Sequence, residues 1–155
     1  MIQIKNGLQI LVLDVDEDYA NSVGNILSEA GANTLLANNA KDGMELFKKI
    51  TPEIVITDLR LDGKSGTDEG IDLIQSFRNI VPGFFCIVVT SYPDTRLSRD
   101  NYQLGINYLL IKPCSPERIL YAVDKGIELL ETRRNLNILK KLVRETQKIN
   151  SISVN

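Results

Sequence analysis

The chain has 155 residues, of which 43% are hydrophobic and 25% are charged, and its formal net charge is -2. These values fit one globular domain with a sizeable core. A nearly neutral chain lacks the basic signature of a nucleic-acid-binding protein, and no apolar run approaches the ~20 residues that a membrane span needs. We therefore expect no direct binding to nucleic acid and no contact with a membrane.

The residue types also restrict the chemistry and the compartment. The chain has no histidine, which removes the usual general base and the commonest metal ligand. Any catalysis must therefore use carboxylates, hydroxyls, lysine or a metal held by oxygen. Cys86 and Cys114 lie far apart without metal-type spacing, and the N-terminal residues MIQIKNG lack the long apolar core of a signal peptide. We expect a cytoplasmic protein with reduced thiols.

Apolar runs alternate with amphipathic segments along the chain. Strands are predicted at 8–13, 34–37, 53–57, 84–90 and 106–111, and helices at 19–30, 40–50, 71–80, 95–104 and from 117 to about 149. Ser115 and Pro116 suit the N-cap and the first position of the last helix. Strands and helices that alternate with short links predict an α/β fold, a doubly wound parallel sheet of five strands with an extended C-terminal helix.

Polar side chains follow four of these strands where each strand should end. They are Asp14, Asp58, Thr90 and Lys112. Singly, such an aspartate is usually a turn or cap residue, the threonine a strand end and the lysine a solvated charge. Because the carboxyl ends of parallel strands meet at one edge of a sheet, where α/β proteins bind their ligands, the four together predict a functional site.

The residues at this edge suit phosphoryl transfer. Mg²⁺ takes oxygen ligands and commonly one or two carboxylates, and two carboxylates held close together need a cation between them. A carboxylate beside Mg²⁺ can attack a phosphoryl group and form an aspartyl phosphate. Lys112 would supply positive charge to the transferring oxygens, and Thr90 a hydroxyl.

Four segments, ILVLDVDEDY, IVITDLRL, VVTSY and YLLIKP, give the chain a resemblance to the receiver domain of two-component response regulators over residues 8–130. The resemblance implies a flavodoxin-like sheet with strand order 2-1-3-4-5. It also implies that Asp58 accepts a phosphoryl group from a histidine kinase or phosphotransfer protein, that Thr90 senses the phosphate and that Lys112 contacts it. Asp14, Asp58 and the backbone carbonyl of Arg60 would ligate Mg²⁺, and the Lys112-Pro113 bond is often cis in this family. Such a domain is a switch that can dephosphorylate itself, and not a dedicated enzyme.

The chain departs from the family pattern at three places. The family usually has a second acid after the first strand, which ligates the metal, and here Val15 stands in that position. We hypothesise weaker Mg²⁺ binding, with Asp16 as a candidate replacement ligand. The usual switch aromatic is replaced by Leu109, and Tyr108 should face the opposite way. The loop after Asp58 is about four residues longer than the common form, with Asp62 where a proline is frequent.

Three other readings stay open. The segment LVLDVDED also resembles the first motif of haloacid-dehalogenase-type phosphatases, with Asp14 as nucleophile and Asp16 as acid and base. A flavin-binding module would place a Gly/Ser/Thr-rich loop after the first strand, where this chain has carboxylates that repel a phosphate. Because of Val15 and Leu109, a receiver-like interaction module that is never phosphorylated is a further alternative.

The C-terminal segment differs in charge from the rest of the chain. Residues 131–155 carry a net charge of +4, and residues 1–130 carry -6. We therefore predict a receiver domain at 1–130 and a helical extension at 131–155. Leu136, Leu139 and Val143 follow a 3-4 spacing, which suggests a coiled-coil seam for a homodimer or a connector to a further domain.

Overall fold

The computed structural model describes residues 3–5, 7–61, 68–91, 97, 101 and 103–153. It contains a five-stranded parallel sheet in the order β2-β1-β3-β4-β5. The strands are β1 (Gln9–Leu13), β2 (Asn33–Ala37), β3 (Ile54–Thr57), β4 (Phe85–Thr90) and β5 (Tyr108–Ile111). The helices are α1 (Glu17–Glu29), α2 (Ala40–Ile50), α3 (Asp68–Ile80) and α5 (Pro116–Ser153). The predicted fold class and strand order are confirmed.

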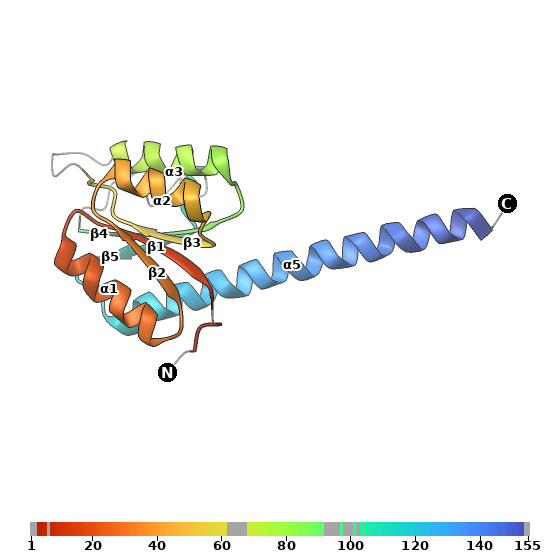
Figure 1. The fold of residues 1–155 in the computed structure, drawn as a ribbon, viewed down its shortest axis with the longest axis horizontal. Coiled ribbons are helices and arrows are strands. Elements are labelled where there is room, and N and C mark those ends of the chain that lie inside the picture. Colours follow the sequence, from red (N-terminus) through yellow and green to blue (C-terminus); the bar gives the residue numbers. More distant parts are fainter. Residues whose placement is uncertain are drawn as a thin grey trace.

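Helices cover both faces of the sheet (Figure 1): α2 and α3 lie on one face, and α1 and the first part of α5 on the other. Alternate residues of the central strands separate into two core clusters. Val12, Ile56 and Ile87 pack towards α1 and α5, whereas Val55 and Cys86 pack towards α2 and α3. Burial on both faces explains why these strands are continuous apolar runs and do not alternate with polar residues.

Three phenylalanines fix the α2 and α3 side of the core. The rings of Phe47 and Phe77 are stacked with centroids 4.1 Å apart, and Phe84 meets Phe47 edge-on at 5.3 Å. Phe47 lies on α2, Phe77 on α3, and Phe84 directly before β4. The contacts therefore join two helices to the sheet through aromatic geometry that is favourable beyond simple burial.

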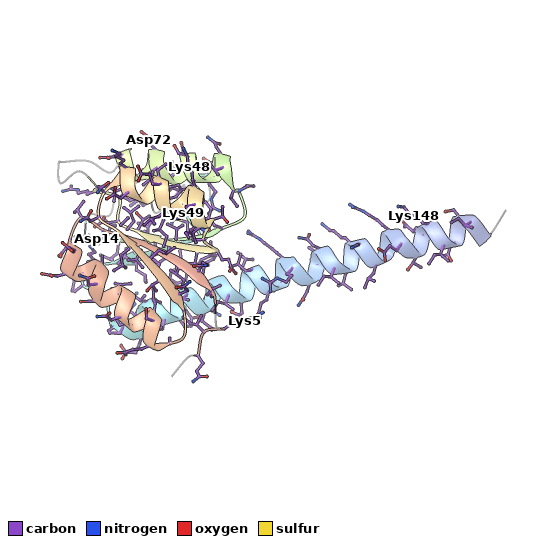
Figure 2. The ribbon with its side chains drawn as sticks, viewed as in Figure 1. Lys5, Asp14, Lys48, Lys49, Asp72 and Lys148 are labelled. Carbon is purple, nitrogen blue, oxygen red and sulfur yellow. The ribbon has the colours of Figure 1, made fainter. Side chains whose placement is uncertain are left out.

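The last helix leaves the domain as one continuous element. Ile119, Ala122 and Val123 in its first turns are buried in the core, whereas all described side chains from residue 131 onwards are exposed. Figures 1 and 2 show the second part of α5 extending away from the sheet, with Lys148 near its far end. The helix continues to Ser153, four residues past the predicted end. Within the described part of the chain, no helix has the length and apolar character to cross a membrane.

Several element boundaries differ from the predicted ones. Helix α1 begins at Glu17, two residues early, because the side chain of Asp16 caps it. Strand β5 begins at Tyr108 and not at residue 106. The helix predicted at 95–104 and the loop after Asp58, with Asp62, lie largely outside the described residues, so both stay predictions.

Candidate functional site

Asp14, Asp58 and Lys112 meet at the carboxyl edge of the sheet. Asp14 follows β1, Asp58 follows β3 and Lys112 follows β5. The Lys112 Nζ atom lies 2.6 Å from Asp14 Oδ2 and 3.1 Å from Asp58 Oδ2. One ammonium group therefore bridges two carboxylates that follow different strands. The sequence predicts that these three residues meet at this edge of the sheet, and they do.

Asp58 is held by backbone and side-chain donors. Its Oδ1 atom accepts hydrogen bonds from the N–H groups of Leu59 at 2.6 Å and Arg60 at 3.4 Å, while Oδ2 faces Lys112. The residue is only 8% exposed. Donors on one oxygen fix the rotation of the carboxylate, and the second oxygen is directed towards the positive charge.

Asp14 is buried beside Asp58. Its Oδ1 atom accepts a hydrogen bond from the N–H of Asp16 at 2.9 Å, and Oδ2 pairs with Lys112. Burial raises the pKa of the Asp14 carboxyl, and the hydrogen bonds from Lys112 and from the N–H of Asp16, together with the charge of Lys112, oppose this effect. The contacts of Asp14 with Lys112 therefore offset part of the effect of burial on the pKa of this carboxyl.

The two residues after Asp14 add no ligand atom to the pair of carboxylates. Val15 is 40% exposed and carries no ligand atom. Asp16 is exposed, and its Oδ1 atom accepts a hydrogen bond from the N–H of Tyr19 at 3.2 Å, which caps α1. For Asp16 to serve as a metal ligand, its side chain would have to leave the helix N-terminus.

Lys112 is enclosed by its neighbours. Desolvation lowers the pKa of Lys112, but the hydrogen bond and charge of Asp14, together with Asp58, outweigh it and raise the pKa above its usual value. The Nζ atom lies 4.1 Å from the centroid of the Tyr19 ring. The next peptide bond, Lys112-Pro113, is cis, as the family resemblance implied.

Thr90 ends β4 and is fully buried. Its carbonyl oxygen accepts a hydrogen bond from the N–H of Lys112 at 2.9 Å, so the backbones of the two residues are joined. On β5, Tyr108 packs on the α1 and α5 face and Leu109 on the α2 and α3 face. The predicted opposite orientation of this pair is confirmed, and Leu109 occupies the position of the usual aromatic.

The described residues contain no group of three or more His, Cys, Asp or Glu side chains that could hold a metal ion. Asp14 and Asp58 bring a pair of carboxylates together at this edge. That pair fits Mg²⁺, which often binds through one or two carboxylates and keeps several waters.

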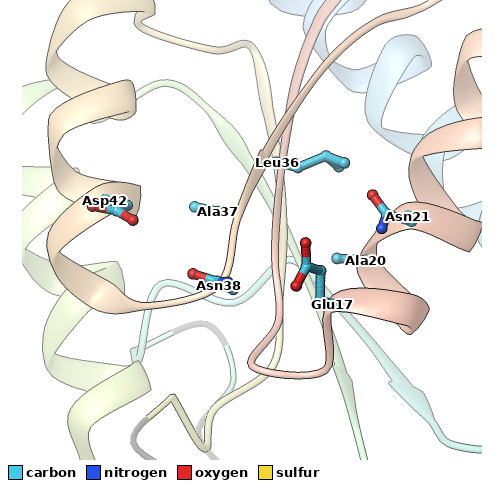
Figure 3. A pocket seen from close by; sticks show the side chains of 7 residues that line it. All are labelled: Glu17, Ala20, Asn21, Leu36, Ala37, Asn38 and Asp42. Carbon is cyan, nitrogen blue, oxygen red and sulfur yellow. The ribbon is translucent and has the colours of Figure 1, made fainter.

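A hollow of about 190 Å³ opens near this edge, between α1, the end of β2 and the start of α2. Figure 3 shows Glu17 and Asn21 on α1 at one side and Asp42 on α2 at the other, with Leu36 on β2 between them. Asp14, Asp58 and Lys112 do not line it. The hollow is therefore distinct from the carboxylate pair.

Sequence reasoning missed Tyr19 as a neighbour of the site. It read this residue only as the first position of a helix. The ring on α1 reaches Lys112, which lies 93 positions further along the chain, and no local pattern encodes such a contact.

Comparison with known proteins places this geometry in a family. The family model described as "Response regulator receiver domain" matches residues 10–124. The alginate biosynthesis transcriptional regulatory protein AlgB of Pseudomonas syringae pv. tomato is 27% identical over 141 residues, which cover 91% of this chain and 31% of that protein. A cyclic di-GMP phosphodiesterase of Thermotoga maritima is 24% identical over 138 residues, covering 86% of this chain and 36% of that protein.

Solved structures agree with the fold. A CheY-like receiver domain protein from Methanospirillum hungatei has a TM-score of 0.74 at 22% identity, covering 86% of this chain and 99% of its own. NtrX from Brucella abortus has a TM-score of 0.76 at 22% identity, covering 86% of this chain and 30% of its own. The chain spans about a third of the length of the curated relatives it matches first. It belongs to the receiver domain family of two-component response regulators.

Proposed function

We propose that this domain works as a phosphoryl-accepting switch, with Asp58 as the acceptor and a histidine kinase or phosphotransfer protein as the donor. The observation that carries the proposal is the pairing of Lys112 Nζ with both Asp58 and Asp14 at one sheet edge. The switch is not a dedicated enzyme, and we place it in the cytoplasm.

In the proposed reaction, a carboxylate oxygen of Asp58 forms a bond to phosphorus while the bond from phosphorus to the donor histidine nitrogen breaks. The nitrogen keeps the electron pair and takes up a proton. Lys112 neutralises negative charge on the transferring oxygens, and the Thr90 hydroxyl binds the phosphoryl group afterwards. Mg²⁺, when bound, would supply further positive charge, with Asp14, Asp58 and the carbonyl of Arg60 as its ligands.

The proposed metal site has fewer acidic ligands than is usual in the family. Val15 offers no ligand atom, and Asp16 is used as the cap of α1. We expect weak Mg²⁺ binding and slow phosphoryl transfer. Titration of Mg²⁺ in the presence of a phosphate mimic measures this, and Val15→Asp should tighten binding. Ordinary affinity in the unmodified chain would show that Asp16 compensates.

The direct test is mass spectrometry after incubation with a small phosphodonor and Mg²⁺. We expect one added phosphoryl group, which is lost in Asp58→Asn. If the covalent phosphate is lost in Asp14→Asn but kept in Asp58→Asn, the chain is a phosphatase of the haloacid-dehalogenase type. If neither the unmodified chain nor either variant gains a phosphoryl group, the domain is an interaction module that is not phosphorylated.

The output is proposed to pass through protein contacts. Phosphorylation would draw Thr90 inwards and alter the face formed by β5 and α5. The exposed second part of α5 carries Leu136, Leu139 and Val143, which are 49%, 59% and 54% exposed. We propose that this stripe forms a homodimer or connects to a further domain.

Sedimentation of the full chain and of a chain cut after Leu130 tests the dimer. The full chain should be dimeric and the shortened chain monomeric. If both are monomeric, self-association through α5 is excluded and only the role as a connector survives.

A further inference from the structure

Tyr19 is the aromatic neighbour of the bridging lysine. Its ring centroid lies 4.1 Å from Lys112 Nζ, within the range of a favourable contact between an ammonium group and an aromatic face. The residue lies in the first turn of α1, whose start is fixed by the Asp16 cap. The cap therefore fixes the first turn of α1 and, with it, the position of the Tyr19 ring.

The ring restricts a side chain that would otherwise be mobile. Lysine has a flexible four-carbon stem and a strongly hydrated charge. In this structure the Lys112 side chain is only 15% exposed, with carboxylates on one side of its ammonium group and the Tyr19 ring on another. We expect the ring to shield Nζ from water on that side and to limit the rotamers in which Lys112 can reach both Asp14 and Asp58.

The hydroxyl of Tyr19 has no part in this arrangement. Its oxygen is buried and has no hydrogen-bond partner among the described residues. Lys112 Nζ contacts the face of the ring and makes no hydrogen bond to this hydroxyl, so the contact comes from the ring alone. Phenylalanine should therefore replace tyrosine without loss at this site.

We propose that Tyr19 is a positioning residue for phosphoryl transfer, whose ring holds Lys112 Nζ between the two carboxylates. This role rests on the proposed function, because it concerns the lysine that neutralises the transferring phosphoryl group.

The test measures the rate of phosphoryl uptake from acetyl phosphate, with Mg²⁺, as a function of donor concentration. Tyr19→Leu should lower the limiting rate about tenfold and leave the half-saturating donor concentration unchanged, whereas Tyr19→Phe should match the unmodified chain. Tyr121→Leu is the matched control. Tyr121 also faces a lysine, Lys125, at 5.2 Å, but it is 50% exposed on α5 and should not affect the rate.

A second measurement does not depend on phosphorylation. An amine-reactive acetylating reagent, with peptide mass spectrometry, reports how fast Lys112 is modified. Tyr19→Leu should speed modification of Lys112 but not of Lys125, and Tyr19→Phe should leave both unchanged. Unchanged rates for Tyr19→Leu in both assays would overturn the positioning role while the proposed function stands, as would equal losses in the Leu and Phe variants. Failure of the unmodified chain to take up phosphate would overturn both.

Discussion

Replacement of Lys112 by methionine removes the charge between Asp14 and Asp58 and keeps an unbranched side chain that is slightly shorter. Both carboxylates contact one nitrogen, at 2.6 Å and 3.1 Å, so the contacting oxygens are no more than about 6 Å apart. At an effective dielectric constant of about 20, two negative charges at that distance repel by about 3 kcal/mol. Loss of one partner from a buried ion pair costs a similar amount, about 3–5 kcal/mol.

We therefore expect Lys112→Met to lower the free energy of unfolding by about 3 kcal/mol at neutral pH without divalent cations. Urea denaturation followed by circular dichroism measures it. Mg²⁺ should restore more stability to the variant than to the unmodified chain, because the cation replaces the missing charge. Acid should do the same, since the pKa of Asp14 is already raised by burial and protonation removes the repulsion.

The matched control is Lys125→Met. Lys125 Nζ also lies 3.1 Å from a carboxylate oxygen, that of Glu128, but both side chains are exposed. Water screens such a pair, so this variant should show no measurable change and no response to Mg²⁺. The reasoning is refuted if the two variants lose equal stability, or if Mg²⁺ stabilises Lys112→Met no more than the unmodified chain.

Two further predictions concern the core. A Cβ atom at Gly70 would lie 2.4 Å from the Leu59 Cα atom, whereas one at Gly83 would meet nothing within 4 Å. Gly70→Ala should therefore lower the free energy of unfolding by about 3 kcal/mol, and Gly83→Ala should change it little. Urea denaturation of the two variants measures both effects. Burial raises the pKa of the Cys86 thiol from 9.0 to about 12. The unfolded chain therefore ionises first, and the stability from this group, complete below pH 9, should be lost as the pH rises towards 12. Replacing Cys86 with alanine should flatten that decline, and in the folded protein a thiol reagent should modify only Cys114.

Buried strands and capped helices were predictable from the sequence because local rules control them. Helix α2 was placed at its observed bounds, since Asn39 caps its start and Thr51 ends it in the left-handed conformation before a proline. The start of α3 was missed by three residues. Gly70 lies in its first turn because the helix passes close to Leu59, and a glycine there resembles loop sequence.

The site was predictable where topology controls it. Asp14, Asp58 and Lys112 each follow a strand, and parallel strands bring their ends to one edge. The contact at Tyr19 was not predictable, because it depends on how the first turn of α1 faces the end of β5, which is a matter of packing between distant segments. The cap at Asp16 is a local contact with the N–H of Tyr19, and it was missed because the start of α1 was placed two residues late.

The unbroken course of α5 gives the domain a mechanical arm. The 23 residues from 131 to 153 rise about 35 Å along the helix axis. A tilt of about 5° where the helix leaves the core would therefore move its far end by about 3 Å. Ile119 and Val123 root the arm in the sheet, so a shift there, too small to rearrange the core, would be magnified at the distant tip.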